Sequence, residues 1–118
     1  EEMELTLERI TVAYDISSVF RHLHGHKLVY RDIKPDNIGF DVRNDIKVFD
    51  FGLCKELSPD EHTAGGLYKM SGLTGCLDFM APEVALSKPY NLLADVYSFG
   101  VLLWEIMSLE IPFEDIEQ

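Results

Sequence analysis

The sequence predicts an α+β fold that is mainly helical and carries short β-hairpins. One stretch near the start repeats apolar residues at three- and four-residue steps, and another near the end is apolar on nearly every face. Between them, short segments rich in Ile, Val, Phe and Tyr alternate with turn residues. With 118 residues, of which 47% are hydrophobic, the chain has enough apolar material for one domain with its own core.

Charge and composition narrow the function classes. The net charge is −11 and no two of the ten basic residues are adjacent, which argues against nucleic-acid binding. The longest apolar run, Val101 to Trp104, is far shorter than the ~20 residues that span a bilayer, so no membrane segment is expected in this chain. Cys54 and Cys76 cannot form a multi-disulfide framework, and an intracellular, cytoplasmic location is expected. The oligomeric state is left open.

The first element is expected to be a helix over residues 5–24. Its apolar residues share one helical face: Val12, Ile16, Val19, Phe20 and Leu23. Gly25 is typical of a helix end. The histidines at 22, 24 and 26 are interpreted as side chains suited to the terminal carbonyls rather than as metal ligands, because no tetrahedral ligand set lies nearby.

The middle of the chain is expected to combine a hairpin with a long loop. Residues 38–49 favour a β-hairpin, because two apolar segments flank the turn residues Asn44-Asp45. Hydrophobic periodicity fails from Gly52 to Phe79, where Gly and Ser-Pro accumulate. This stretch is predicted to be a long, mobile loop, and loops of this length are commonly functional.

The last predicted element is a helix over residues 91–107. It follows Pro89, and Asn91 is a candidate N-cap. Because apolar residues occupy nearly every face, we expect this helix to lie in the middle of a domain. Too little chain follows, up to Gln118, to cover it.

Polar side chains with catalytic chemistry lie in two short segments. Asp32, Lys34 and Asn37 fall within residues 30–37, and Asp50 follows the predicted hairpin. Mg²⁺ takes oxygen ligands, usually one or two carboxylates, and leaves room for phosphates. Asn37 and Asp50 supply such a set, while Asp32 is free to accept a proton and Lys34 to neutralise phosphoryl charge.

The order of these motifs resembles the C-terminal lobe of a eukaryotic protein kinase. Residues 30–37 are similar to the catalytic loop, with Asn five positions after Asp, and Asp50-Phe51-Gly52 is similar to the magnesium-binding triplet. Ala81-Pro82-Glu83 resembles the motif that closes the activation segment, here residues 50–83, and residues 95–100 resemble the central helix. The implied fold is a protein-kinase-like C-lobe. It is expected to be incomplete, because the N-lobe motifs and the last helices are absent.

The resemblance implies a role for each matching residue. Asp32 would be the catalytic base, and Lys34 would face the phosphate. Asn37 and Asp50 would bind Mg²⁺ and, with Lys34, hold the ATP phosphates.

Two further acidic residues would be structural. Asp95 would hydrogen-bond the backbone of the catalytic loop near Tyr30 and Arg31. Glu83 would pair in the family with a later arginine, but the last arginine of this chain is Arg43.

The implied activity is ATP- and Mg²⁺-dependent transfer to protein serine or threonine hydroxyls. A lysine two places after Asp32 resembles serine/threonine kinases, and residues 98–105 resemble the tyrosine-kinase-like branch, which includes many such enzymes. The partner would be a protein substrate with a Ser or Thr acceptor. Two alternatives stay open: a pseudokinase-like protein-binding module, and a kinase fragment without function.

Regulation by phosphorylation is a further expectation. An arginine beside the catalytic Asp, here Arg31, commonly pairs with a phosphate on the activation segment. Ser71 and Thr74 are the favoured acceptors, against the alternative of an unmodified, solvated loop. Cys76 stands where the family usually has a hydroxyl that hydrogen-bonds the catalytic Asp and Lys. Two interpretations stay open: the thiol, a poorer hydrogen-bond partner, weakens closure of the active site, or the side chain is small, half-buried and only packs. Gly39 replaces a larger apolar residue under the adenine, which predicts weaker nucleotide packing.

Overall fold

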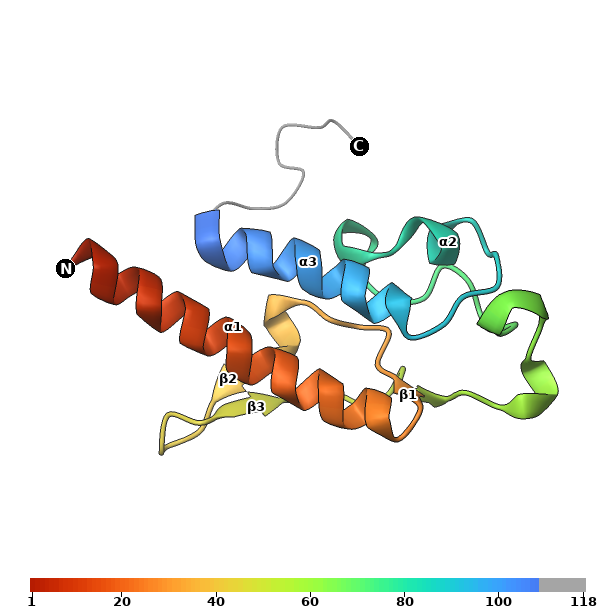
Figure 1. Cartoon of the computed structure of the whole chain (residues 1–118), viewed down its shortest axis with the longest axis horizontal. Helices are drawn as coiled ribbons and strands as arrows, with labels where there is room; N and C mark the ends of the chain where they lie inside the picture. Colours follow the sequence, from red (N-terminus) through yellow and green to blue (C-terminus); the bar gives the residue numbers. More distant parts are fainter. Residues whose placement is uncertain (109–118) are drawn as a thin grey trace.

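The computed structural model describes residues 1–108, and two helices form its frame. Helix α1 (Glu2–Gly25) and helix α3 (Leu93–Ser108) lie side by side and run in opposite directions (Figure 1). At one end, Arg9 Nη1 donates to the carbonyl oxygen of Met107 at 3.4 Å. At the other end, His24 Nε2 lies 2.8 Å from Asp95 Oδ2. The helical pair is the larger part of an α+β fold, whose β part consists of two small antiparallel sheets.

The limits of both helices follow from local chemistry. Helix α1 begins three residues before the predicted 5–24 helix and buries Ala13, Ile16 and Phe20, which lie three and four residues apart on one face. Helix α3 begins at Leu93, two residues after the predicted start. Asn91 Oδ1 accepts a hydrogen bond from the Leu93 amide at 2.9 Å, which satisfies a free donor at the helix start.

The predicted hairpin is present as strands β2 (Ile38–Phe40) and β3 (Ile46–Val48). They pair antiparallel, with Ile38 opposite Val48 and Phe40 opposite Ile46. The turn depends on Asp41, whose Oδ1 accepts from the amides of Arg43 and Asp45 at 2.8 and 3.0 Å. Asn44 supplies the positive φ of 67°.

A second small sheet joins strand β1 (Leu28–Val29) to strand β4 (Lys55–Glu56). Leu28 lies opposite Glu56 and Val29 opposite Lys55 in an antiparallel pair. Three 3₁₀ turns follow, at Pro59–Glu61, Ala64–Gly66 and Leu77–Phe79. The long loop predicted from Gly52 to Phe79 thus contains one two-residue strand and three single 3₁₀ turns. Two-residue strands and single turns carry no hydrophobic periodicity, so the sequence pattern could not reveal them.

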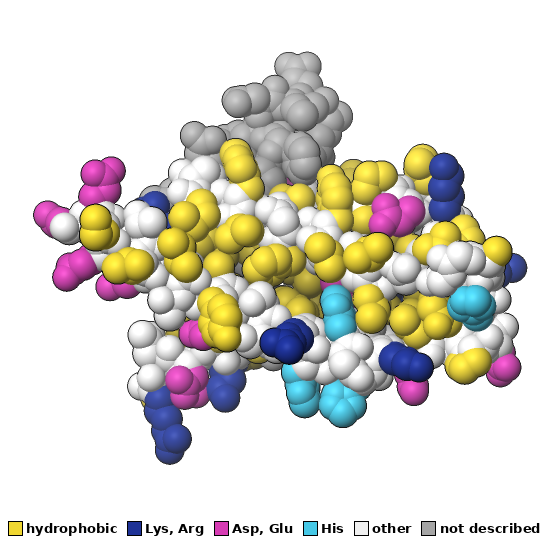
Figure 2. Space-filling view, viewed as in Figure 1, with side chains coloured by type: hydrophobic (Ala, Val, Ile, Leu, Met, Phe, Trp, Pro, Cys, Tyr) yellow, Lys and Arg dark blue, Asp and Glu magenta, His cyan; other side chains and the backbone are white. Residues whose placement is uncertain are grey.

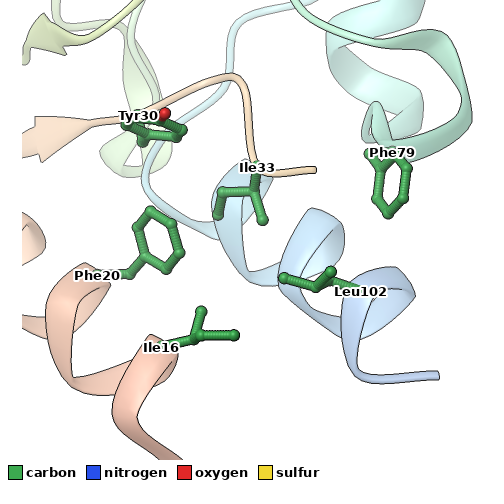
Figure 3. Close-up of a cluster of buried hydrophobic side chains, with 6 residues drawn as sticks. All are labelled: Ile16, Phe20, Tyr30, Ile33, Phe79 and Leu102. Carbon is green, nitrogen blue, oxygen red and sulfur yellow. The ribbon is translucent and has the colours of Figure 1, made fainter. Parts of the chain in front are cut away.

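The core consists of two clusters. The first lies between the two long helices and joins them to the segment after β1 (Figure 3); its members are Ile16, Phe20, Tyr30, Ile33, Phe79 and Leu102. The second surrounds the short helix α2 (Pro82–Ala85) and consists of Ala81, Val84, Tyr90 and Ala94. Both clusters contact α3, which therefore links the two halves of the core.

Helix α3 is not covered on every face by residues 1–108. Leu93, Val96 and Trp104 are 64%, 53% and 45% exposed, whereas Asp95, Ser98 and Leu102 are buried. Hydrophobic side chains gather over α1 and α3 on the face shown in Figure 2. None of the helices described in residues 1–108 combines the length and the apolar character needed to cross a membrane.

Candidate functional site

The segment from Tyr30 to Asn37 brings three of the predicted site residues together. The Asn37 side-chain nitrogen Nδ2 donates to the carbonyl oxygen of Asp32 at 2.7 Å and to its carboxylate Oδ2 at 2.9 Å. Lys34 Nζ lies 3.8 Å from the other carboxylate oxygen, Oδ1. The Asp32 carboxylate therefore has a hydrogen-bond donor on one oxygen and a positive charge near the other, and these two contacts orient it.

A 3₁₀ turn at Pro35–Asn37 produces this arrangement. Pro35 occupies the first position of the turn, where its fixed φ suits the helical start. The turn carries Asn37 back toward Asp32, and Asn37 is only 6% exposed. Because both hydrogens of its Nδ2 point at Asp32, the amide oxygen of Asn37 is the atom left for a cation.

Asp50 follows β3 and is tied to the same loop through the backbone. The amide of Phe49 donates to the carbonyl oxygen of Asn37 at 2.7 Å. The single hydrogen of the Tyr30 hydroxyl is shared between the carbonyl oxygens of Phe49 and Asp50, the latter at 2.9 Å from the hydroxyl oxygen. Burial raises the pKa of Tyr30 well above its ordinary value, and the negative Asp32 and Asp50 raise it further. Tyr30 therefore stays protonated and can keep donating.

The side chain of Asp50 is exposed and held in a local turn. Its Oδ1 accepts from the Gly52 amide at 3.0 Å, and its φ of 56° is unusual for a residue other than glycine. The second carboxylate oxygen remains for a ligand. Residues 1–108 contain no group of three or more His, Cys, Asp or Glu placed to hold a metal ion. The oxygens of Asn37 and Asp50 fit Mg²⁺, which is typically held by one or two protein ligands together with phosphates.

Asp95 holds the start of the loop from inside the core. Its carboxylate is 1% exposed and accepts from the backbone amides of Tyr30 at 2.7 Å and Arg31 at 2.9 Å. These are the amides to which the kinase resemblance pointed. Arg31 has a φ of 67°, in the left-handed region, so the two hydrogen bonds hold a strained backbone directly before Asp32.

His24 completes this anchor, and sequence reasoning had missed it. Its Nε2 lies 2.8 Å from Asp95 Oδ2, so the buried carboxylate has three partners. His22 and His24 lie in the last turn of α1, as predicted, and His24 also contacts Asp95. His22 and His26 contact each other through their rings. The available signal was spacing, because His24 lies one helical turn after the buried Phe20.

The Arg31 side chain has neutral partners. Its Nε donates to the carbonyl oxygen of Leu53 at 2.6 Å, and its Nη1 donates to the hydroxyl of Tyr90 at 3.3 Å. Among the predicted regulatory residues, Ser71 is exposed, and the hydroxyl of Thr74 donates to the carbonyl oxygens of Ser71 and Gly72. The structure therefore connects Arg31 to Ser71 through Tyr90, whose hydroxyl donates to the Ser71 carbonyl at 2.7 Å.

The other predicted positions have simpler surroundings. Glu83 lies in α2, half-buried, and takes part in none of the ion pairs formed within residues 1–108. Cys76 packs against the first core cluster and, with Asp32, lines a cavity of about 20 Å³. A Cβ added at Gly39 would lie 2.9 Å from the ring of Phe49, so this ring occupies the space that a larger residue at 39 would need.

Residues 4–118 match the protein kinase domain family. The chain is similar to mitogen-activated protein kinase kinase kinase 13-B of Xenopus laevis, with 42% identity over 102 residues, which are 86% of this chain and 10% of that protein. The human kinase kinase kinase 13 is 41% identical with the same coverage.

A more distant relative covers more of the chain. The probable serine/threonine-protein kinase gdt4 of Dictyostelium discoideum is 34% identical over 115 residues, which are 93% of this chain and 7% of that protein. The chain thus spans about a tenth or less of the length of these relatives.

Proposed function

This chain belongs to the protein kinase family, and from that premise we propose that the protein transfers the γ-phosphate of ATP to serine or threonine hydroxyls of a protein substrate. The observation that carries the proposal is the placement of Asp32, with Asn37 Nδ2 on one carboxylate oxygen and Lys34 near the other. A carboxylate fixed in this way can accept the proton of an attacking hydroxyl. One relative, named as a probable serine/threonine-protein kinase, supports the choice of acceptor.

Each neighbouring residue has a part in this reaction. Lys34 lies beside the base and would carry positive charge to the phosphoryl group in transfer. Asn37 and Asp50 would hold Mg²⁺, which, when bound, neutralises charge on the phosphates. Asn37 acts twice, because its nitrogen orients Asp32 while its oxygen is left for the ion.

Replacement of the base tests the proposal. In the intact protein, Asp32→Asn should lower kcat for phosphate transfer to dephosphorylated casein by about 10²- to 10⁴-fold, the usual contribution of a general base. Asp60→Asn, at an exposed carboxylate in the Pro59–Glu61 turn, is the matched control and should leave kcat unchanged. Phosphoamino-acid analysis of the product should give phosphoserine or phosphothreonine. Full activity of Asp32→Asn would contradict the role of Asp32, and phosphotyrosine would contradict the substrate class.

A protein-binding module is the second candidate, and one observation favours it. Leu93, Val96 and Trp104 of α3 are exposed within residues 1–108 and form an apolar surface. A binding module should work without catalysis, so the double variant Asp32→Asn/Asp50→Asn would keep its cellular function. A kinase would lose that function together with phosphate transfer.

We also propose that a phosphate on Ser71 or Thr74 regulates the site. Ser71 is exposed, and its carbonyl is already joined to the Arg31 side chain through Tyr90. A phosphate there would offer the guanidinium a charged partner in place of neutral ones. Mass spectrometry of peptides covering residues 66–80 from stimulated cells should find the modification. Unmodified peptides only would contradict it.

A further inference from the structure

The buried Tyr90 lies where the activation segment meets the catalytic loop. Its side chain is 1% exposed and packs in the second core cluster with Val84 and Ala94. A tyrosine hydroxyl has one hydrogen to donate and lone pairs to accept with. Tyr90 uses both, because it donates to the Ser71 carbonyl at 2.7 Å and accepts from Arg31 Nη1 at 3.3 Å. One hydroxyl therefore joins the two segments.

Besides its hydroxyl, the backbone of Tyr90 also hydrogen-bonds the activation segment. Its amide donates to the Tyr68 carbonyl at 3.0 Å, and its carbonyl accepts from the Tyr68 amide at 2.9 Å. Farther along, the Leu73 amide donates to the Val84 carbonyl at 2.9 Å. Residues 68–73 thus lie along the chain from Val84 to Tyr90, fixed at three places.

The segment then passes directly over the catalytic loop. Gly75 has a φ of +99°, and a Cβ built there would lie 2.3 Å from the carbonyl oxygen of Arg31. Thr74 and Cys76, on either side of it, line the same small cavity as Asp32. Any displacement of residues 68–75 therefore changes the surface against which a substrate hydroxyl must approach Asp32.

From these contacts we propose that Tyr90 is a positioning residue whose hydroxyl fixes the activation segment on the catalytic loop. It acts through Ser71 on one side and Arg31 on the other, and its hydrogen bonds need no phosphate. The proposal rests on the proposed kinase function for its effect on catalysis, whereas the link itself is a structural statement that can be tested without activity. The kinetic consequence is specific: binding of the protein substrate should depend on Tyr90 more than binding of ATP.

The variant Tyr90→Phe keeps the buried ring and removes the hydroxyl. Its matched control is Tyr97→Phe on α3, where the side chain is 39% exposed and no hydrogen bond to the hydroxyl occurs within residues 1–108. Hydrogen exchange of the intact protein should show the Tyr68 and Leu73 amides exchanging about five- to tenfold faster in Tyr90→Phe, with the amides of α1 unchanged. Unchanged exchange at Tyr68 and Leu73 would overturn the link. Equal acceleration throughout α1 and α3 would also overturn it, because it would indicate general destabilisation.

Steady-state kinetics then test the positioning role. With dephosphorylated casein, Tyr90→Phe should raise KM for the protein about five- to tenfold and change KM for ATP less than about twofold. An equal rise of both KM values would overturn a specific role in placing the substrate surface. The failure of the link and the failure of the proposed function can be told apart. If the wild type transfers no phosphate but Tyr90→Phe still exchanges faster at Tyr68 and Leu73, the link is supported and the proposed function is contradicted.

Discussion

Asp95 lies 64 residues beyond Arg31 in the chain, and its Oδ1 accepts the Arg31 amide at 2.9 Å. This contact places a fully buried carboxylate of α3 under the residue that precedes Asp32. Because Arg31 has a φ of 67°, the loop needs a partner that compensates its strained backbone, and Asp95 provides one. The conformation of the candidate site thus depends on the position of α3 in the core.

Asp95→Asn should therefore lower both stability and activity. An asparagine has one oxygen to offer where Asp95 accepts from His24, Tyr30 and Arg31, so at least one buried donor loses its partner. We expect a loss of about 2–4 kcal/mol in the free energy of unfolding. Hydrogen exchange in urea, followed on peptides from α1 and α3 of the intact protein, measures it. The control Asp60→Asn should change this free energy by less than about 0.5 kcal/mol; a similar value for both variants would contradict the anchor role.

Two glycine-to-alanine changes should shift the free energy of unfolding in opposite directions. Gly75→Ala places a Cβ 2.3 Å from the Arg31 carbonyl oxygen at a φ of +99°, so it should cost about 1–3 kcal/mol and slow phosphate transfer. Gly100→Ala lies in α3, where an added Cβ meets nothing within 4 Å, and should stabilise that helix by about 0.5–1 kcal/mol. Hydrogen exchange in urea distinguishes the two signs. Stabilisation by Gly75→Ala would rule out the close contact with Arg31.

Asn37→Ala should weaken the response to Mg²⁺. The change removes the donor to Asp32 and the amide oxygen that would bind the ion. We expect the Mg²⁺ concentration at half-maximal activity to rise about 10- to 100-fold, as found when groups that support a metal are removed. Rates at saturating ATP over a range of Mg²⁺ concentrations provide the measurement, with Asp36→Asn, at the exposed neighbouring carboxylate, as the control. A half-maximal concentration that does not move would exclude Asn37 as a ligand.

Glu105 should make the stability of the fold depend on pH. Burial raises the pKa of its carboxyl above the ordinary 4.5, and the nearby negative Asp36 raises it further. As pH rises from 4.5 through the raised pKa, the unfolded chain loses this proton first, so stability falls over that interval. Glu105→Gln should therefore be more stable than the wild type at pH 7 and equally stable below the ordinary pKa.

Thermal unfolding of the intact protein at pH 4 and pH 7 measures this difference. The matched control is Glu8→Gln, at an exposed position of α1, which should follow the wild type at both pH values. A Glu105→Gln variant that gains no stability at pH 7 would contradict the assignment of the penalty to Glu105.

Local sequence patterns predicted the elements that local interactions determine. Apolar spacing predicted the helix that became α1 and the one that became α3, and the turn before Ile46 predicted the hairpin. Spacing within residues 30–37 also identified Asp32, Lys34 and Asn37, since these side chains meet through one 3₁₀ turn. In each case, the interacting residues are close enough along the chain for the pattern to be visible.

Contacts between distant residues were decided by the tertiary structure. The pairing of β1 with β4, the placement of His24 on Asp95, and the link from Arg31 through Tyr90 to Ser71 join residues 19 to 71 positions apart. No periodicity marks such partners, because which side chains meet depends on how α1 and α3 pack around the shared core. The sequence alone thus determined which residues form the proposed kinase site, whereas packing determined what holds those residues in place.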